Sequence, residues 1–245
     1  MTKISKYVDE IIRLGIGYQP SSVILNQLGQ TVFVPLIGAF AVGKTATIKA
    51  VSQIDPDFGG VHSLTTRRPR AGETSSDFVF LNHNEAGLKR LVKDIKLGSL
   101  VQFTVHPTTH YVYGSDIVAY QNQYSMLAML PEAIPKNIMN SFRSVETIVM
   151  VTRPDEWLQR IAERRKVGFD GDLQKRLKEG INNLEWCLNQ TSGLNWIDNS
   201  GRAIEETAQE LISIVKYGQK SNPSVKNVGK QLLATMKSLL DAQLA

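Results

Sequence analysis

Hydrophobic residues recur along the chain in two patterns that alternate with each other. Short apolar runs with the length of buried strands lie at 31–37, 77–81, 99–105, 124–130, 147–152 and 196–197. Apolar residues at helical spacing fill much of the sequence between and after them: after Thr45 up to 54, over 85–97, from Pro154 onward, and over 170–190 and 204–217. Alternation of strands with helices is typical of an α/β fold, which we therefore predict. In the helix that Pro154 opens, we expect Trp157, Leu158 and Ile161 to face the core.

The two ends of the chain stand outside this alternation. Helical spacing near the start is broken by Gly15, Gly17 and Pro20, so residues 1–30 are predicted to form a separate helical leader. At the other end, residues 219–245 are predicted to form a linker and an amphipathic helix. Such a helix can lie on a membrane surface, on its own domain or on a partner subunit. We favour packing on protein, and a homodimer through the terminal helices is one form of it.

Residues 38–45 read Gly-Ala-Phe-Ala-Val-Gly-Lys-Thr, a complete G-x-x-x-x-G-K-T phosphate loop. It follows an apolar run and precedes a helical pattern, which is the context that the motif requires. Lys44 is predicted to reach the β- and γ-phosphates of ATP, and the Thr45 hydroxyl to hold Mg²⁺. Backbone N–H groups and the helix dipole complete a predicted donor-nucleotide site. That site comprises Gly38, Ala41, Val42, Gly43, Lys44, Thr45 and Ala46.

Composition and charge narrow the function classes. The 245 residues are 42% hydrophobic and 21% charged, and no run approaches the ~18 apolar residues of a membrane span. The N-terminus does not resemble a signal peptide, and a single cysteine, Cys187, excludes an internal disulfide, so we expect a cytoplasmic protein. The net charge of +5 is densest over 65–70, which fits either nucleic acid or a small phosphorylated ligand. The phosphate loop favours the second, so small-molecule nucleotides are the expected partners and nucleic acid is not.

The stretch 63–73, Ser-Leu-Thr-Thr-Arg-Arg-Pro-Arg-Ala-Gly-Glu, is followed by Asp77-Phe78 and resembles the guanylate kinase family. In that family a phosphate loop precedes Ser-x-Thr-Thr-Arg-x-Pro-Arg-x-Gly-Glu and then Asp-Tyr-x-Phe. Tyr113-Gly114-Ser115 is similar to a later family motif, and the resemblance extends over about 31–217. It implies a P-loop NTPase-type parallel sheet flanked by helices within residues 31–218. An inserted acceptor-binding subdomain is expected at 60–118 and a short lid at 163–176.

The resemblance also implies roles for individual residues. Arg165 and Arg176 match lid arginines, which with Lys44 would be the catalytic residues, and Asn199 matches an asparagine beside the adenine pocket. The acceptor nucleotide would be held by Ser63, Arg67, Arg70, Phe78, Gln102, Tyr113 and Ser115. Guanidinium groups suit phosphate, and phosphoryl transfer needs positioning and electrostatic stabilisation rather than a side-chain nucleophile. The implied activity is that of a nucleoside monophosphate kinase using ATP and Mg²⁺.

Departures from the family pattern fall on recognition of the acceptor base. Gln102 stands where the family has a glutamate that accepts hydrogen bonds from guanine, and Ala128 and Leu130 replace an Asp-x-Asp pair. Phe78 lacks the hydroxyl of the family's tyrosine. Three hypotheses therefore remain: a kinase of GMP or another nucleotide, a kinase of a different acceptor, and an ATP-binding regulatory or interaction module. We expect packing rather than chemistry from Cys187, and no zinc site at His106 and His110.

Overall fold

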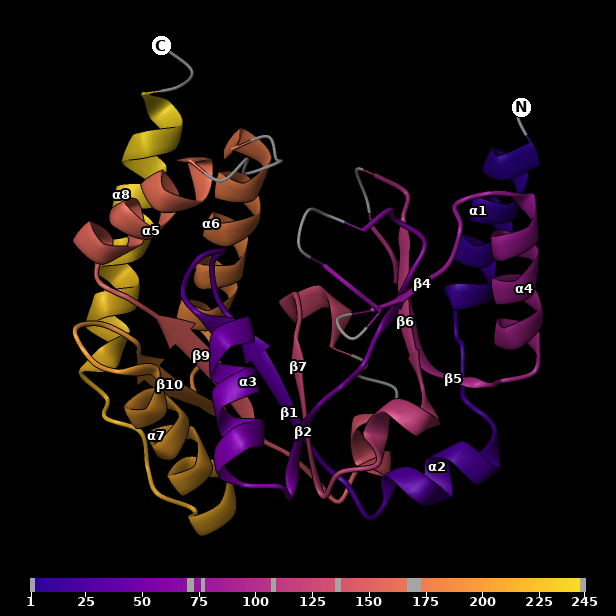
Figure 1. Ribbon diagram of the computed structural model, residues 1–245, viewed down its shortest axis with the longest axis horizontal. Coiled ribbons are helices and arrows are strands. Elements are labelled where there is room, and N and C mark those ends of the chain that lie inside the picture. The colour runs from indigo at the N-terminus through magenta and orange to yellow at the C-terminus, as the bar shows by residue number, and fades with distance from the viewer. Residues whose placement is uncertain are drawn as a thin grey trace. The chain divides into compact units, whose positions relative to one another are not determined.

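The computed structural model (Figure 1) describes residues 3–69, 73–75, 78–106, 109–134, 138–166 and 173–242. The chain divides into two compact units. The first comprises Met1–Val32, Gly60–Ser125 and Pro135–Ser144. The second comprises Phe33–Gly59, Met126–Ile134 and Val145–Ala245.

A largely parallel sheet forms the centre of the second unit. Its strands run in the order β10 (Leu194–Asp198), β9 (Thr147–Val151), β1 (Val32–Ile37), β7 (Tyr124–Ala128) and β2 (Phe58–Gly60), and β8 (Ser144–Val145) pairs with β1. β9 is parallel to both of its neighbours, with Leu36 opposite Ile148 and Trp196 opposite Val149. All six residues of β1 are buried, as expected for an apolar strand inside a parallel sheet. The predicted α/β fold, with its sheet flanked by helices, is confirmed.

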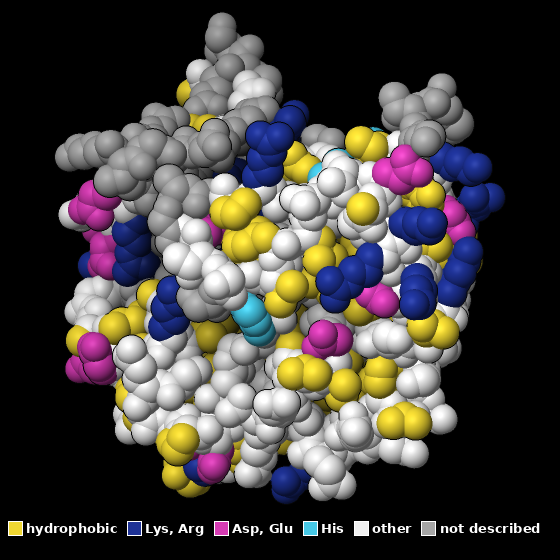
Figure 2. All heavy atoms as spheres, turned by 45° about the vertical axis from the view of Figure 1, so that its right-hand side comes forward, with side chains coloured by type: hydrophobic (Ala, Val, Ile, Leu, Met, Phe, Trp, Pro, Cys, Tyr) yellow, Lys and Arg dark blue, Asp and Glu magenta, His cyan; other side chains and the backbone are white. Residues whose placement is uncertain are grey.

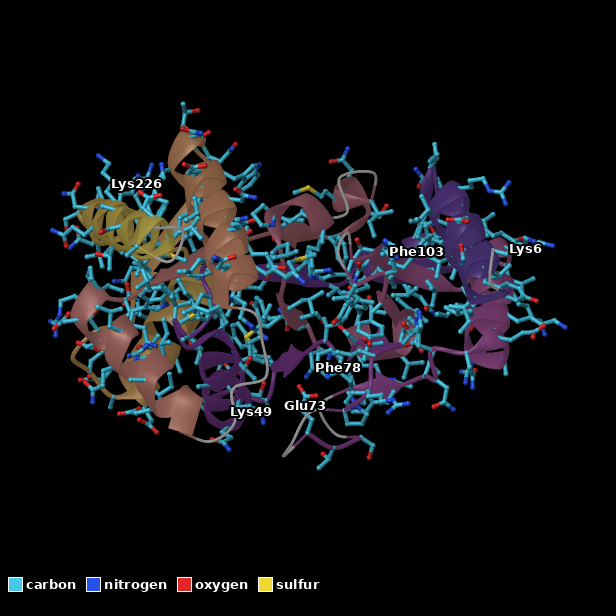
Figure 3. All side chains as sticks on the ribbon, turned by 90° about the horizontal axis from the view of Figure 1, so that it is seen from above. Lys6, Lys49, Glu73, Phe78, Phe103 and Lys226 are labelled. Carbon is cyan, nitrogen blue, oxygen red and sulfur yellow. The ribbon has the colours of Figure 1, made fainter. Side chains whose placement is uncertain are left out.

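The helices that the structure describes in the second unit are α3 (Lys44–Ile54), α5 (Pro154–Lys166), α6 (Leu173–Asn189), α7 (Ile204–Tyr217) and α8 (Val225–Asp241). α3 packs with α7, and α6 packs with α8. Figure 3 shows α6 and α8 on one side of the strands and α3 on the other. β1 ends at Ile37 and α3 begins at Lys44. The loop that joins them therefore starts at the carboxyl end of a buried strand.

The C-terminal helix α8 packs against its own unit. It contacts α6, β9 and β10, and its Met236 and Leu232 are fully buried. Gly229 lies so close to the Trp196 ring that a Cβ there would crowd it, which explains a glycine in the middle of a helix. Lys237 of α8 pairs with Glu185 of α6 at 2.6 Å.

On α5, two of the three predicted core residues are buried and one is not. Trp157 and Ile161 are 0% and 5% exposed, whereas Leu158 is 42% exposed, so the expectation for Leu158 was wrong. Successive residues of a helix differ by about 100° in direction, which turns Leu158 away from the side that Trp157 buries.

The first unit has its own sheet and its own hydrophobic core. The strand order is β4 (Val79–Phe80), β3 (Leu64–Thr65), β6 (Val112–Asp116) and β5 (Leu100–Val105), with β6 antiparallel to both of its neighbours. Helices α1 (Lys3–Gly15) and α4 (Glu85–Lys96) pack together over a core that includes Ile11, Leu91 and Leu100. The N-terminal residues therefore share a core with residues of the 60–118 segment.

The described residues also include one short α-helix and several 3₁₀ turns. They are α2 (Ser22–Leu28) and the 3₁₀ turns η1 (Ile117–Tyr120), η2 (Pro131–Ala133) and η3 (Met139–Ser141).

Charged side chains on the surface of the first unit are mixed in sign. On the side that carries α1 and α4, Figure 2 shows Lys and Arg interspersed with Asp and Glu. Lys96 pairs there with Glu10 at 2.6 Å, and Arg90 with Asp94 at 3.7 Å. Among the described residues, no helix is both long enough and apolar enough to cross a membrane.

Candidate functional site: a phosphate loop and an arginine-centred cluster

The phosphate loop joins β1 to α3 in a conformation that only certain residues tolerate. Gly38, Ala41 and Gly43 have φ angles of 144°, 63° and 104°. A Cβ on Gly38 would collide with the carbonyl oxygen of Met150, so glycine is needed there for space as well as for conformation. Ala41 has no such freedom, because an L-residue with a side chain rarely adopts a positive φ. Its neighbours in the fold must therefore hold it there.

Two carbonyl groups of the loop are tied to donors from distant elements. The Phe40 carbonyl accepts the indole Nε1–H of Trp157 at 2.8 Å. The Val42 carbonyl accepts Nδ2 of Asn199 at 2.9 Å and Nη1 of Arg160 at 3.3 Å. Asn199 is itself oriented, because Thr207 donates to its Oδ1 at 2.8 Å. The loop conformation is thus fixed by side chains of the protein.

Lys44 and Thr45 begin α3, at the positive end of its dipole. Lys44 Nζ donates to the carbonyls of Gly38 and Ala39, at 2.8 Å each. The Thr45 and Ala46 side chains are exposed on the first turn. Within the described parts of the chain, no three His, Cys, Asp or Glu residues cluster as a metal site would require.

Arg160 and Trp157 are residues of this site that the sequence did not reveal. Arg160 also donates to the Asn199 carbonyl at 2.7 Å, so it links the loop to the end of β10. Arg160 lies four residues after Glu156 and pairs with it at 3.4 Å. In the sequence, this spacing is that of an ordinary ion pair on a helix surface. Both residues bind backbone carbonyls more than a hundred positions earlier in the chain. No side-chain pattern encodes such contacts.

The predicted lid, 163–176, falls only partly within the described residues. α5 ends at Lys166 and α6 begins at Leu173, and residues 167–172 between them are not described. Arg165 belongs to the last turn of α5, and Arg176 lies half-buried in the first turn of α6. Their predicted roles on the transferring phosphoryl group remain predictions.

The sheet of the first unit brings most of the predicted acceptor residues together. β3 pairs with β6 so that Thr65 lies opposite Tyr113, and β5 pairs with β6 so that Gln102 lies opposite Ser115. Ser63 and Ser115 are buried, and Gln102 is 9% exposed. Tyr113 and Phe78 are half-buried. Arg70 lies outside the described residues.

Arg67 is the centre of this cluster. It is 6% exposed and forms a two-pronged ion pair with Glu73, with N–O distances of 2.5 and 2.8 Å. Its guanidinium also lies 4.8 Å from the Phe78 ring centre and 5.6 Å from that of Phe80 (Figure 3 labels Glu73 and Phe78). Burial, the largest single effect, would lower the pKa of Arg67, but the interactions with Glu73 and Tyr113 together outweigh it and the net shift is upward, so the guanidinium stays charged.

One N–H group of Arg67, at Nε, has no described hydrogen-bond partner. Its Nε is buried and has no hydrogen-bond acceptor among the described residues. A buried donor without a partner costs free energy, which an oxygen of a bound anion would recover. Phosphate fits this requirement chemically, although Glu73 already balances the charge of Arg67.

Gln102 belongs to a neutral, buried network. Its Nε2 donates to Ser115 Oγ at 3.2 Å, and Ser115 Oγ lies 3.0 Å from the Tyr120 hydroxyl. Burial raises the pKa of Tyr120, so this hydroxyl remains protonated at neutral pH. The Gln102 amide is therefore already engaged by another side chain of the protein.

Cys187 and His106 are two further residues of reactive type that the sequence analysis considered. Cys187 is fully buried in α6, and burial raises the pKa of its thiol to about 12, so it is not a thiolate at neutral pH. His106 Nδ1 accepts the Thr109 backbone N–H at 3.3 Å, and the His106 ring lies 6.5 Å from that of Tyr113.

Comparison with known proteins supports the fold. A guanylate kinase from Anaplasma phagocytophilum has a similar structure, with a TM-score of 0.50 and 16% sequence identity over 82% of this chain and 93% of that chain. No protein-family model and no curated protein matches the sequence. At this identity the similarity shows the fold alone, so this chain has a guanylate-kinase-like α/β fold.

Proposed function

We propose that this protein transfers a phosphoryl group from ATP to a nucleoside monophosphate, GMP or a related acceptor. The observation that carries the proposal is the phosphate loop, complete in sequence and held by Trp157, Asn199 and Arg160 through its own carbonyls. Such a loop presents backbone N–H groups, a lysine and a helix N-terminus to anionic oxygens. The guanylate-kinase-like fold agrees with this donor site.

On the donor side, Lys44 would leave the carbonyls of Gly38 and Ala39 and bind the β- and γ-phosphates. Thr45 would hold Mg²⁺, which when bound neutralises charge on the phosphates. Arg165 and Arg176 would approach the transferring group from the lid, and Asn199 would flank the adenine. Because these cations act on charge that develops during transfer, they would accelerate the chemistry by electrostatic stabilisation.

On the acceptor side, Nε of Arg67 supports phosphate binding by the first unit, because it is buried and has no acceptor in the described part of the chain. Tyr113 contributes a hydroxyl that interacts with Arg67. Ser63, Ser115 and Arg70 belong to the same proposed set. Phe78 would contribute its ring rather than a hydrogen bond.

A second candidate function is an ATP-binding regulatory or interaction module without GMP kinase activity. Two observations favour it over an ordinary guanylate kinase. Glu73 already neutralises Arg67, and Gln102 is engaged by Ser115 where guanine would need a carboxylate. A phosphate loop that binds ATP would serve this module equally well.

The deciding experiment incubates the protein with Mg²⁺–ATP and each common nucleoside monophosphate, and measures ADP and nucleoside diphosphate. We expect turnover with at least one monophosphate. Lys44→Ala should weaken Mg²⁺–ADP binding about tenfold to hundredfold, because charge-assisted hydrogen bonds are lost. Lys49→Ala, on the exposed side of the same helix, is the matched control and should bind normally. Tight ADP binding with no turnover would favour the regulatory module or a kinase of a different acceptor, and normal binding by Lys44→Ala would refute nucleotide binding at this loop and with it both functions.

A further inference from the structure

We propose that Trp157 is a positioning residue that holds the phosphate loop in its nucleotide-binding conformation. The inference rests on one part of the proposed function, the binding of a nucleotide by the loop, and does not require phosphoryl transfer. It concerns a residue of α5 that lies outside the loop motif and that the sequence assigned to the core.

Trp157 makes two contacts with the same loop residue. The indole is fully buried, and its Nε1–H donates to the Phe40 carbonyl at 2.8 Å. Its ring also meets the Phe40 ring edge to face, with centroids 5.4 Å apart and planes at 66°. One side chain therefore holds both the backbone and the side chain of Phe40.

The hydrogen bond from Trp157 lies next to Ala41, the loop residue with a side chain and a positive φ. The Phe40 carbonyl belongs to the peptide that joins Phe40 to Ala41, and Ala41 has a φ of 63°. Rotation of that peptide is the simplest way for Ala41 to leave the left-handed region, which disfavours any residue with a Cβ. Because the indole N–H holds the carbonyl, it opposes this rotation.

The loop is held on the other side of Ala41 as well. Asn199 and Arg160 fix the Val42 carbonyl, which belongs to the peptide between Val42 and Gly43, so the loop is anchored directly before Ala41 and again one residue after it. With these carbonyls committed to protein donors, a bound phosphate does not have to reorganise the loop. Preorganisation of this kind lowers the cost of binding.

The variant Trp157→Phe separates the hydrogen bond to the loop from the packing of the aromatic ring in the core. Trp157→Phe keeps an aromatic ring in the core but removes the N–H donor. Trp196→Phe is the matched control, because Trp196 is 1% exposed in the same unit and its Nε1 has no acceptor among the described residues. Both variants remove one buried indole N–H, but only the first removes a hydrogen bond to the loop.

Calorimetric titration of the full chain with Mg²⁺–ADP measures the effect. Trp157→Phe should bind about fivefold more weakly, the size expected for one net hydrogen bond. Trp196→Phe should stay within about twofold of the wild type. Adding Ala41→Gly to Trp157→Phe should recover most of the loss, because glycine adopts a positive φ without steric strain.

Hydrogen exchange without nucleotide tests the same role independently of binding. Amides of Phe40–Gly43 should exchange faster in Trp157→Phe and at the wild-type rate in Trp196→Phe. Faster exchange in a protein that does not bind ADP would refute the proposed function and leave the positioning role intact. Wild-type exchange and affinity in Trp157→Phe would overturn the inference. So would an affinity loss that Ala41→Gly does not recover, since that loss would reflect core packing.

Discussion

Replacing Gln102 with glutamate would supply the carboxylate that the resemblance to guanylate kinases leads us to expect at this position for guanine recognition. Guanine offers adjacent N–H donors, and a carboxylate accepts from both, whereas the Gln102 amide already donates to Ser115. We expect Gln102→Glu to raise kcat/KM for GMP about tenfold relative to the other monophosphates, because hydrogen bonds to charged groups are the stronger ones. Parallel turnover assays with each monophosphate measure this preference.

The same variant should acquire a pH-dependent stability. Burial raises the pKa of a carboxyl group in the folded state, so stability is greatest where the group is protonated and is lost as the pH rises through that pKa. The melting temperature of Gln102→Glu should therefore fall, relative to wild type, between about pH 5 and about pH 8. Gln123→Glu, at an exposed position of the same unit, should show neither effect. An unchanged GMP preference in a variant that melts as predicted would exclude Gln102 from base recognition.

Among the elements, α8 should contribute directly to the stability of the second unit. Met236 is fully buried, and it lies against Gly180 of α6 so closely that a Cβ on the glycine would overlap the Met236 methyl group. Ala39 of the phosphate loop is the next neighbour of the same glycine. Met236→Ala should reduce the free energy of unfolding by about 2–5 kcal/mol, because it removes buried atoms and leaves a cavity.

Guanidinium unfolding of Met236→Ala and Gln231→Ala provides the measurement and its control. Gln231 is exposed on the same helix, so its replacement should change the free energy by less than about 0.5 kcal/mol. The midpoint of Met236→Ala should fall while the slope stays that of wild type. Equal midpoints for the two variants would contradict the packing of α8 on α6.

The elements also show what the sequence could and could not predict. Helices with a clear apolar stripe, such as Glu85–Lys96, and the apolar strand Val32–Ile37 were predicted within a residue or two, because periodicity reports burial directly. β3 and β8 are only two residues long and were missed, since so short a strand has no period. The acceptor cluster was predicted from resemblance, whereas the Arg67–Glu73 pair and the Trp157 contact depend on tertiary geometry.

For the whole molecule, the two units have separate sheets and carry different proposed ligands. The phosphate loop, Asn199 and Arg160 belong to the second unit, and Arg67, Gln102 and Ser115 belong to the first. Since a ligand stabilises the state that binds it, each should slow hydrogen exchange mainly in the unit that holds its site. Mg²⁺–ADP should protect the loop and the start of α3, and the accepted monophosphate should protect β3 and β6.

This exchange map separates the two candidate functions without relying on turnover. At about one hundred times its Kd, a ligand adds roughly 2.7 kcal/mol to the stability of the state that binds it, which is enough to slow exchange clearly. A kinase requires protection in both units, each by its own ligand. A regulatory module that binds only ATP requires protection by Mg²⁺–ADP in the second unit and none by any monophosphate in the first. Because Leu91 and Ile11 lie in the core of the first unit, their amides report its global stability and distinguish local protection at Arg67 from a general effect.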